Sequence, residues 1–97
     1  MKRKAVVLNS QDNVATALAD LEAGEVVEVE VDKGVVSVTL ADSIPFGHKF
    51  SLTDIKSDSA IMKYGEIIGR ATTDINLGQH VHVHNVASTR GRGDVAK

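Results

Sequence analysis

The sequence predicts a small, mainly β domain with one or two short helices. The strongest evidence is a β-hairpin: residues 25–31 and 35–40 alternate aliphatic with polar side chains, and Gly34 closes the loop between them. Further short apolar runs, separated by turn residues, follow from residue 48 to residue 85. Many short strands of this kind are typical of compact all-β domains.

A five-residue pattern predicts corners between the strands. It consists of a polar residue, Leu or Ile, two variable residues and Gly, and it occurs at residues 20–24, 43–47 and 74–78. A buried aliphatic side chain can anchor such a corner, and glycine permits a positive φ before the next strand. The irregular spacing excludes a solenoid and favours a folded-over β domain.

Short strands are predicted on both sides of the hairpin. The runs that predict them are residues 4–9, 48–52, 60–64, 66–72 and 80–85. Gly69 lies inside one run, where glycine often marks a bulge or a close backbone approach.

Two segments predict helical structure. Apolar side chains in residues 11–21 recur at i, i+3, i+4 and i+7, which places Val14, Ala17, Leu18 and Leu21 on one helical face. Residues 53–55 are expected to form a single helical turn.

Length and composition exclude several classes of protein. A chain of 97 residues, 42% of them hydrophobic, makes about one globular domain. The absence of cysteine excludes disulfides, thiolate metal sites and cysteine nucleophiles. Eleven basic and 13 acidic residues give a net charge of −2, so neither nucleic acid nor a membrane is an expected partner.

The chain ends carry two further expectations. Residues 1–8 begin like a signal peptide, but their apolar run is too short, and no run approaches the roughly 18–20 residues of a membrane span. We therefore expect a soluble cytoplasmic protein. Its expected organisation is a β domain at residues 1–86 and a polar tail rich in Gly and Arg at residues 87–97.

Residues 80–85, His-Val-His-Val-His-Asn, are the leading candidate for chemistry. In an extended strand His80, His82 and His84 share one face. Three interpretations are open: a solvated polar face, a metal site, or acid–base and substrate-binding work. His80 and His84 would lie roughly 13 Å apart along a strand. An adjacent pair plus an outside ligand is therefore the favoured metal site.

Other polar side chains extend this candidate site. His48 and Lys49 stand at the start of one predicted strand, and Lys63 and Tyr64 stand at the end of another. With Asn85 they make a donor-rich set that suits a polyhydroxylated, negatively charged small molecule, although each is also a common surface residue. In the tail, Arg90 and Arg92 are able to hold a carboxylate by paired hydrogen bonds.

Several blocks of the chain resemble a known family, the amino-terminal domain of altronate dehydratase. Its relatives include galactarate dehydratase and the small subunit of sulfolactate sulfo-lyase. The similar blocks are residues 12–18, 47–55, 61–65, 67–71 and 78–85. They follow one another in order over nearly the whole chain, and the Gly-His-Lys and His-Val-His-Val-His-Asn blocks are the most specific.

The resemblance implies an SAF-type domain of the β-clip fold, within a lyase that eliminates water or sulfite from a hydroxylated acid. It also implies a divalent metal, iron(II) or manganese(II), bound mainly by a partner. Fused relatives continue where this chain ends, so a separate large dehydratase subunit is the expected partner. A homo-oligomer is a further possibility.

Dehydration of a sugar acid requires a base, an acid and a stabilising cation. We assign these roles to residues of the chain as hypotheses. The catalytic candidates are His48, His82 and His84. The metal candidates are His80 and His82. The substrate-binding candidates are Lys49, Lys63, Tyr64, Asn85, Arg90 and Arg92.

The leading functional hypothesis is the small subunit of an altronate dehydratase-like hydro-lyase. The alternatives are a sulfolactate sulfo-lyase-type small subunit and a non-catalytic module that binds a sugar acid or assists assembly. A purely structural β domain, with the histidines as a solvated stripe, is the remaining interpretation.

Overall fold

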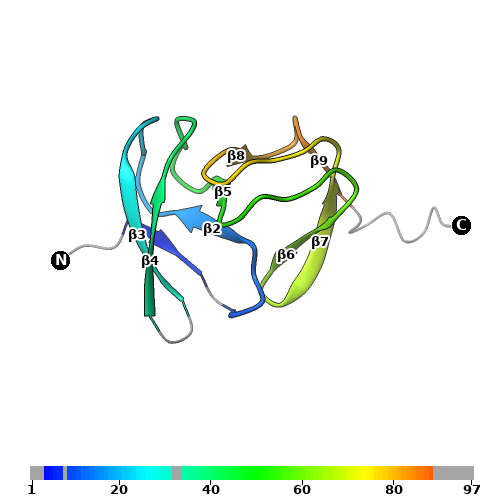
Figure 1. The fold of residues 1–97 in the computed structure, drawn as a ribbon, viewed down its shortest axis with the longest axis horizontal. Helices are drawn as coiled ribbons and strands as arrows, with labels where there is room; N and C mark the ends of the chain where they lie inside the picture. The colour runs from blue at the N-terminus through cyan, green and yellow to red at the C-terminus, as the bar shows by residue number, and fades with distance from the viewer. Residues whose placement is uncertain (1–3, 8, 32–33, 89–97) are drawn as a thin grey trace, which may run out of the picture.

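The computed structural model describes residues 4–7, 9–31 and 34–88, and within these ranges it contains nine β-strands and no helix (Figure 1). The strands are β1 (Ala5–Val6), β2 (Val14–Ala17), β3 (Val26–Val31), β4 (Gly34–Thr39), β5 (Lys49–Ser51), β6 (Ala60–Lys63), β7 (Glu66–Ala71), β8 (His80–Val81) and β9 (Val86–Ser88). The predicted mainly β fold class is confirmed, and the described residues contain neither of the expected helices.

The strands form three small antiparallel sheets. One has the strand order β1-β2-β5-β8, the second is the hairpin β3-β4, and the third has the order β6-β7-β9. In Figure 1 the four-stranded sheet lies between the β3–β4 hairpin on the left and the β6-β7-β9 sheet on the right. The predicted hairpin is confirmed, with Val26 opposite Thr39 and Val31 opposite Gly34.

Four tight corners connect these strands. We name them corner 1 (residues 18–24), corner 2 (41–47), corner 3 (52–58) and corner 4 (72–78). Corners 1, 2 and 4 contain the repeated sequence pattern, and their glycines have φ angles of 88°, 84° and 85°. The predicted role of glycine at these positions is therefore confirmed.

Corner 3 adopts the same conformation without a glycine. Asp58 occupies the glycine position with a φ of 76°. Aspartate is one of the few other residues that tolerate this left-handed conformation. The sequence pattern missed this corner because the pattern required Gly.

The corners interlock in two pairs. Buried aliphatic anchors bridge each other, Leu21 with Ile44 and Ile55 with Ile75. The last residue of each corner donates its backbone N–H to the carbonyl that precedes the partner corner: Gly24 to Leu40, Gly47 to Ala17, Asp58 to Ala71 and Gly78 to Ser51. The order corner, hairpin, corner, strand thus occurs twice, in a first repeat (residues 18–51) and a second repeat (residues 52–81).

Each repeat has its own hydrophobic core. The first surrounds Phe50 and includes Val27, Val29 and Leu40, and β1 and β2 contribute Ala5, Ala15 and Ala17. The second consists of Val14, Ile55, Ile61, Ala71, Ile75 and Val81. Full burial of one such aliphatic side chain contributes roughly 1.5–3 kcal/mol. The two cores fix the strand ends that meet between the repeats.

The helix expected at residues 11–21 is wrong. Residues 14–17 form β2, which pairs with β1 on one side and β5 on the other. Val14, Ala15 and Ala17 are all buried, because this strand contacts the core on both faces. A short strand of this kind has no two-residue alternation, so its apolar spacing imitates a helix. The helical turn expected at residues 53–55 is also wrong, since Ile55 forms a β-bridge instead.

The β6–β7 hairpin confirms the expectation for Gly69. The register shifts between Ile61 and Met62, which lie opposite Gly69 and Ile67. A Cβ on Gly69 would also lie 2.7 Å from the Ala87 carbonyl oxygen, so β9 passes very close to β7. β9 includes Ala87 and Ser88, the first residues of the expected polar tail, and residues 89–97 lie outside the described ranges.

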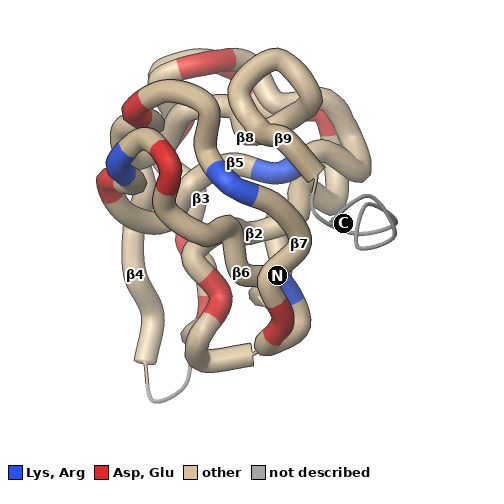
Figure 2. The backbone as a smooth tube through the Cα atoms, turned by 90° about the vertical axis from the view of Figure 1, so that its right-hand side faces the viewer, with Lys and Arg blue, Asp and Glu red and all other residues tan. Residues whose placement is uncertain are grey.

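Figure 2 shows basic positions interspersed with acidic ones along the backbone, without a belt of one sign on the side it presents. Among the described residues, no helix has the length and apolar character needed to cross a membrane.

Candidate functional site

A turn, rather than a strand, carries two of the three clustered histidines. β8 ends at Val81 and a turn follows over residues 82–85, so the strand expected at residues 80–85 is wrong beyond Val81. The cause is Asn85, which is buried at 6% exposure. Its amide Nδ2 donates to the His80 carbonyl at 2.8 Å, and its Oδ1 accepts from the His82 N–H at 3.0 Å. The side chain thereby closes the turn and stabilises it.

The turn brings the imidazole rings together, although residues 82–85 do not form an extended strand. The His80 and His82 ring centroids lie 5.4 Å apart, and those of His80 and His84 lie 5.2 Å apart. His48 joins them from the residue before β5, with its centroid 4.1 Å from His82 and 5.1 Å from His80. This approach follows from the pairing of β5 with β8, in which Phe50 lies opposite His80.

Three of these rings are stacked, with interplanar angles of 8° to 22°, and bring nitrogen atoms close together. One ligand atom from each of His48, His80 and His82 lies within 4.8 Å of the other two. His48 Nδ1 and His80 Nε2 are 2.9 Å apart, a distance at which one nitrogen donates a proton and the other accepts it. We call His48, His80 and His82 the histidine triad; His84 lies beside it. The metal pair expected from the sequence, His80 and His82, thus gains His48.

The surroundings of His80 and His82 favour neutral imidazole. Burial lowers the pKa of His80, the neighbouring histidines lower it further, and Asp42 opposes them. Partial burial also lowers the pKa of His82, followed by the effects of His48, Lys49 and His84. Neutral imidazole has the free lone pair that a metal ligand or a general base needs. Asp42 also accepts the backbone N–H of His80 at 3.0 Å, a contact that no sequence pattern indicated.

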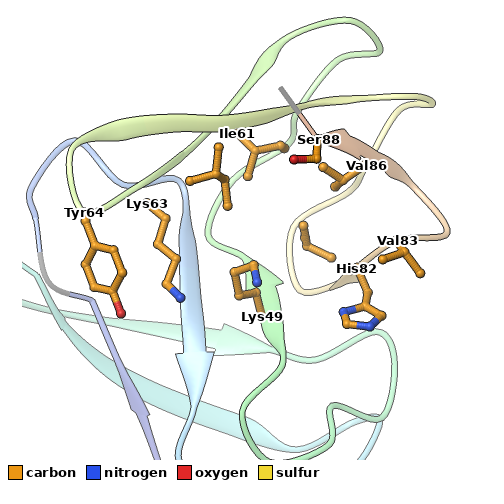
Figure 3. A pocket seen from close by; sticks show the side chains of 10 residues that line it. Lys49, Ile61, Lys63, Tyr64, His82, Val83, Val86 and Ser88 are labelled. Atoms are coloured by element: carbon orange, nitrogen blue, oxygen red, sulfur yellow. The ribbon is translucent and has the colours of Figure 1, made fainter. Parts of the chain in front are cut away.

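A pocket of about 360 Å³ opens beside the triad (Figure 3). It is lined by Lys49, Ile61, Lys63, Tyr64, Ile68, Val81, His82, Val83, Val86 and Ser88. Figure 3 shows Tyr64 and Lys63 on one side and His82 and Val83 on the other, with Lys49 between them. Four of the residues proposed from the sequence therefore share one cavity.

Two lysines give this pocket a positive character. Partial burial lowers the pKa of Lys49, and the positive charge of Lys63 lowers it further. The Lys63 Nζ lies over the Tyr64 ring at 4.7 Å from its centroid, in cation–π geometry. The side-chain amide of Asn85, by contrast, makes two hydrogen bonds within the turn. Arg90 and Arg92 lie outside the described residues.

A domain built from paired corners, short sheets and hairpins is a β-clip domain of the SAF class. The family description "Altronate/galactarate dehydratase SAF domain" matches residues 3–89, and the chain belongs to this family.

Curated relatives of two kinds support the assignment. The chain is 49% identical over 80 residues to the altronate dehydratase of Escherichia coli (strain K12) and 42% identical over 80 residues to that of Bacillus subtilis (strain 168). Both alignments cover 82% of this chain but only 15% of the relative. The chain is also 35% identical over 89 residues to the (2R)-sulfolactate sulfo-lyase subunit alpha of Chromohalobacter salexigens, covering 88% of this chain and 94% of that subunit.

Proposed function

We propose that this chain is the SAF-domain subunit of an altronate dehydratase-like hydro-lyase. It acts with a large dehydratase subunit and contributes to the elimination of water from a sugar acid. The observation that carries the proposal is the histidine triad at the edge of a lysine-lined pocket. This arrangement provides nitrogen ligands, proton-transfer groups and positive charge within one small region, as the reaction requires.

The triad fits a divalent metal by the chemistry of its donors. Three imidazoles each offer a nitrogen within 4.8 Å of the other two, and the pKa values of His80 and His82 are lowered, which favours their neutral forms. Imidazole ligands suit iron more than manganese, which prefers oxygen ligands. Of the two metals expected, the donor set favours iron(II). When bound, such an ion supplies Lewis-acid polarisation of a substrate oxygen.

The remaining groups supply binding and proton transfer. Lys49 and Lys63 attract the substrate carboxylate toward the pocket and favour the negative charge that develops on it when the α-proton leaves. His84 lies beside the triad but outside it, and in this proposal it exchanges a proton with the reacting acid or its leaving hydroxyl. Asn85 positions the turn from which His82 and His84 project.

One observation favours a second candidate, a sulfolactate sulfo-lyase-type small subunit. The similarity spans 94% of a protein named as a subunit, whereas it spans 15% of the altronate dehydratases. In this alternative the same groups would act on a hydroxysulfonate and release sulfite in place of water.

A replacement experiment tests both candidates. The segment of the E. coli altronate dehydratase that matches this chain is exchanged for the described domain, and the purified chimera is assayed with altronate and iron(II). In parallel, the chain replaces subunit alpha of the C. salexigens sulfo-lyase in an assay of sulfite release. Retained altronate dehydration supports the leading proposal, whereas sulfite release alone supports the second candidate.

Variants of the chimera then test the site. His82→Gln, which removes a nitrogen donor of the triad, and His84→Gln, which removes the proposed proton-transfer group, are each expected to lower kcat at least about 100-fold. Lys56→Met, in the exposed part of corner 3, is the control and is expected to leave kcat unchanged. Full activity of both histidine variants would contradict the catalytic proposal and would favour a non-catalytic binding or assembly module.

A further inference from the structure

The positive charge in the pocket has no ionic partner within the described part of the chain. The two ion pairs that the structure shows there, Lys4 with Glu25 and Arg70 with Asp58, lie elsewhere. None of the ten residues that line the pocket is acidic. Lys49 and Lys63 nevertheless lie close enough together for the charge of Lys63 to lower the pKa of Lys49. Two cations held together without a counter-charge create a site for an anion.

Half of the residues that line the pocket are aliphatic. They are Ile61, Ile68, Val81, Val83 and Val86. Aliphatic side chains beside a charge lower the local dielectric constant, which strengthens an ionic interaction at the lysines. The cavity volume of about 360 Å³ is within the range of small-molecule sites, roughly 300–1,000 Å³.

Tyr64 provides an independent observation. It occupies the first position of the two-residue β6–β7 turn with a φ of 58°, followed by Gly65 with a φ of 73°. Asn or Gly is strongly preferred there, because a bulky side chain is strained in the left-handed region. The strained position places the phenol beside the pocket with Lys63 over its ring (Figure 3). Such strain is typical of a functional position.

We propose that Lys49, Lys63 and Tyr64 form an anion-binding subsite that accepts the acidic group of the substrate, whether carboxylate or sulfonate. The inference deepens the proposed function and rests on it for the identity of the substrate. Ammonium groups are compact charges with rotatable donors, whereas an Arg guanidinium is a flat fork matched to one geometry. The subsite therefore selects for a negatively charged hydroxy acid without selecting between a planar and a tetrahedral acidic group.

Equilibrium binding to the metal-free chain tests the subsite separately from catalysis. 3-Hydroxypropionate and isethionate, which differ only in carrying a carboxylate or a sulfonate, are titrated in the presence of a chelator, and the amide and side-chain NMR signals are followed. Both anions are expected to shift the signals of Lys49, Lys63 and Tyr64 with dissociation constants within about tenfold of each other, because the lysines act as point charges. Added salt is expected to weaken binding of both anions.

Lysine variants identify the groups that bind. Lys49→Met and Lys63→Met keep the length of the side chain and remove its charge, and each is expected to weaken binding about 10- to 100-fold. Lys63→Arg, which restores the charge, is expected to recover most of the affinity, and the exposed control Lys56→Met is expected to bind as the unmodified chain does. Thermal unfolding of each variant verifies that the domain is folded.

The outcomes separate this inference from the proposed function. Unchanged affinity in both methionine variants, or no binding of either anion, overturns the subsite. Strong preference for one acidic group over the other overturns its proposed lack of selectivity. If binding depends on both lysines but the chimera fails to dehydrate altronate, the subsite is supported and the proposed function is contradicted.

Discussion

The two repeats share a framework but differ in chemistry. Both interlock their corners by the same backbone hydrogen bonds, so the exposed side chains of the two repeats can differ on the same framework. The first hairpin, β3–β4, is regular and carries alternating Val and Glu on β3. The second, β6–β7, is bulged and turns through Tyr64 and Gly65, where it lines the pocket. A backbone-based framework thus lets one repeat support the fold while the other takes up function.

The junction between the repeats explains where the site forms. Lys49 lies in β5, the last strand of the first repeat, and His80 lies in β8, the last strand of the second. β5 and β8 pair with each other, with Lys49 opposite Val81. The site therefore requires both repeats, although the hairpin residues around it come from the second repeat alone.

The corner glycines allow the largest test of this comparison. A Cβ on Gly78 would overlap the carbonyl oxygen of Thr39, whereas a Cβ on Gly47 would meet nothing within 4 Å. Both have a positive φ, so Gly47→Ala is expected to lower the free energy of unfolding by about 1–2 kcal/mol. Gly78→Ala adds overpacking and is expected to lower it by more than about 3 kcal/mol. Equal losses in the free energy of unfolding of the two variants, measured by urea unfolding, would contradict the close contact of Gly78 with Thr39.

Asn85 allows a test of the turn that follows the second repeat. Asn85→Ala leaves the His80 carbonyl and the His82 N–H without their partner. The expected loss in the free energy of unfolding is about 1–3 kcal/mol, because buried polar groups lose a hydrogen bond. Asn85→Asp keeps the acceptor for His82 and is expected to lose less. A loss of this size without any change in the histidine NMR signals would show that the turn does not position the triad.

The pH dependence of stability tests the lowered pKa values of His80 and His82. The pKa values of His80 and His82 are lowered in the folded chain, so the unfolded chain binds protons more readily. The free energy of unfolding of the metal-free chain is therefore expected to be highest above the ordinary histidine pKa. The free energy of unfolding should fall as the pH decreases from the ordinary histidine pKa toward the lowered pKa values of His80 and His82. The double variant His80→Gln, His82→Gln is expected to show a smaller decrease in chemical unfolding, and an identical decrease would contradict the assigned cause.

The smallest expected effect on stability is that of a substitution in corner 3. Asp58 has a φ of 76° where the other three corners have glycine. Asp58→Gly removes this strain but gives the unfolded chain more freedom, so a net gain of about 0.5 kcal/mol is expected. The Arg70 guanidinium bonds the backbone carbonyl of residue 58, which the substitution retains. A loss of stability on urea unfolding would show that the carboxylate of Asp58 stabilises the corner.

The sequence predicts local features of this fold well and long-range ones poorly. Alternation of Val and Glu predicts β3–β4 because one face of that hairpin is buried. Residues 14–17 were mistaken for a helix because both faces of β2 are buried. Corner 3 was missed because Asp58 replaces the expected glycine.

The candidate site shows the same limit. The clustering of His80, His82 and His84 was predicted, but the strand pleat was the wrong reason for it, since Asn85 bends the chain after Val81. The entry of His48 into the triad depends on the pairing of β5 with β8, two segments about 30 residues apart in the sequence. No local pattern encodes such a pairing.

Titration of the chain with cobalt(II), a spectroscopic substitute for iron(II), tests the central claim most directly. The account predicts one ion per chain with ligand-field absorption typical of nitrogen ligands. Affinity should fall more than about 100-fold in His48→Gln and His80→Gln, which exceeds a typical loss for a group outside the ligand set. His84→Gln, beside the triad, should retain the affinity. No bound ion, or equal affinity in all three variants, would contradict the assignment of His48, His80 and His82 as the functional centre of this domain.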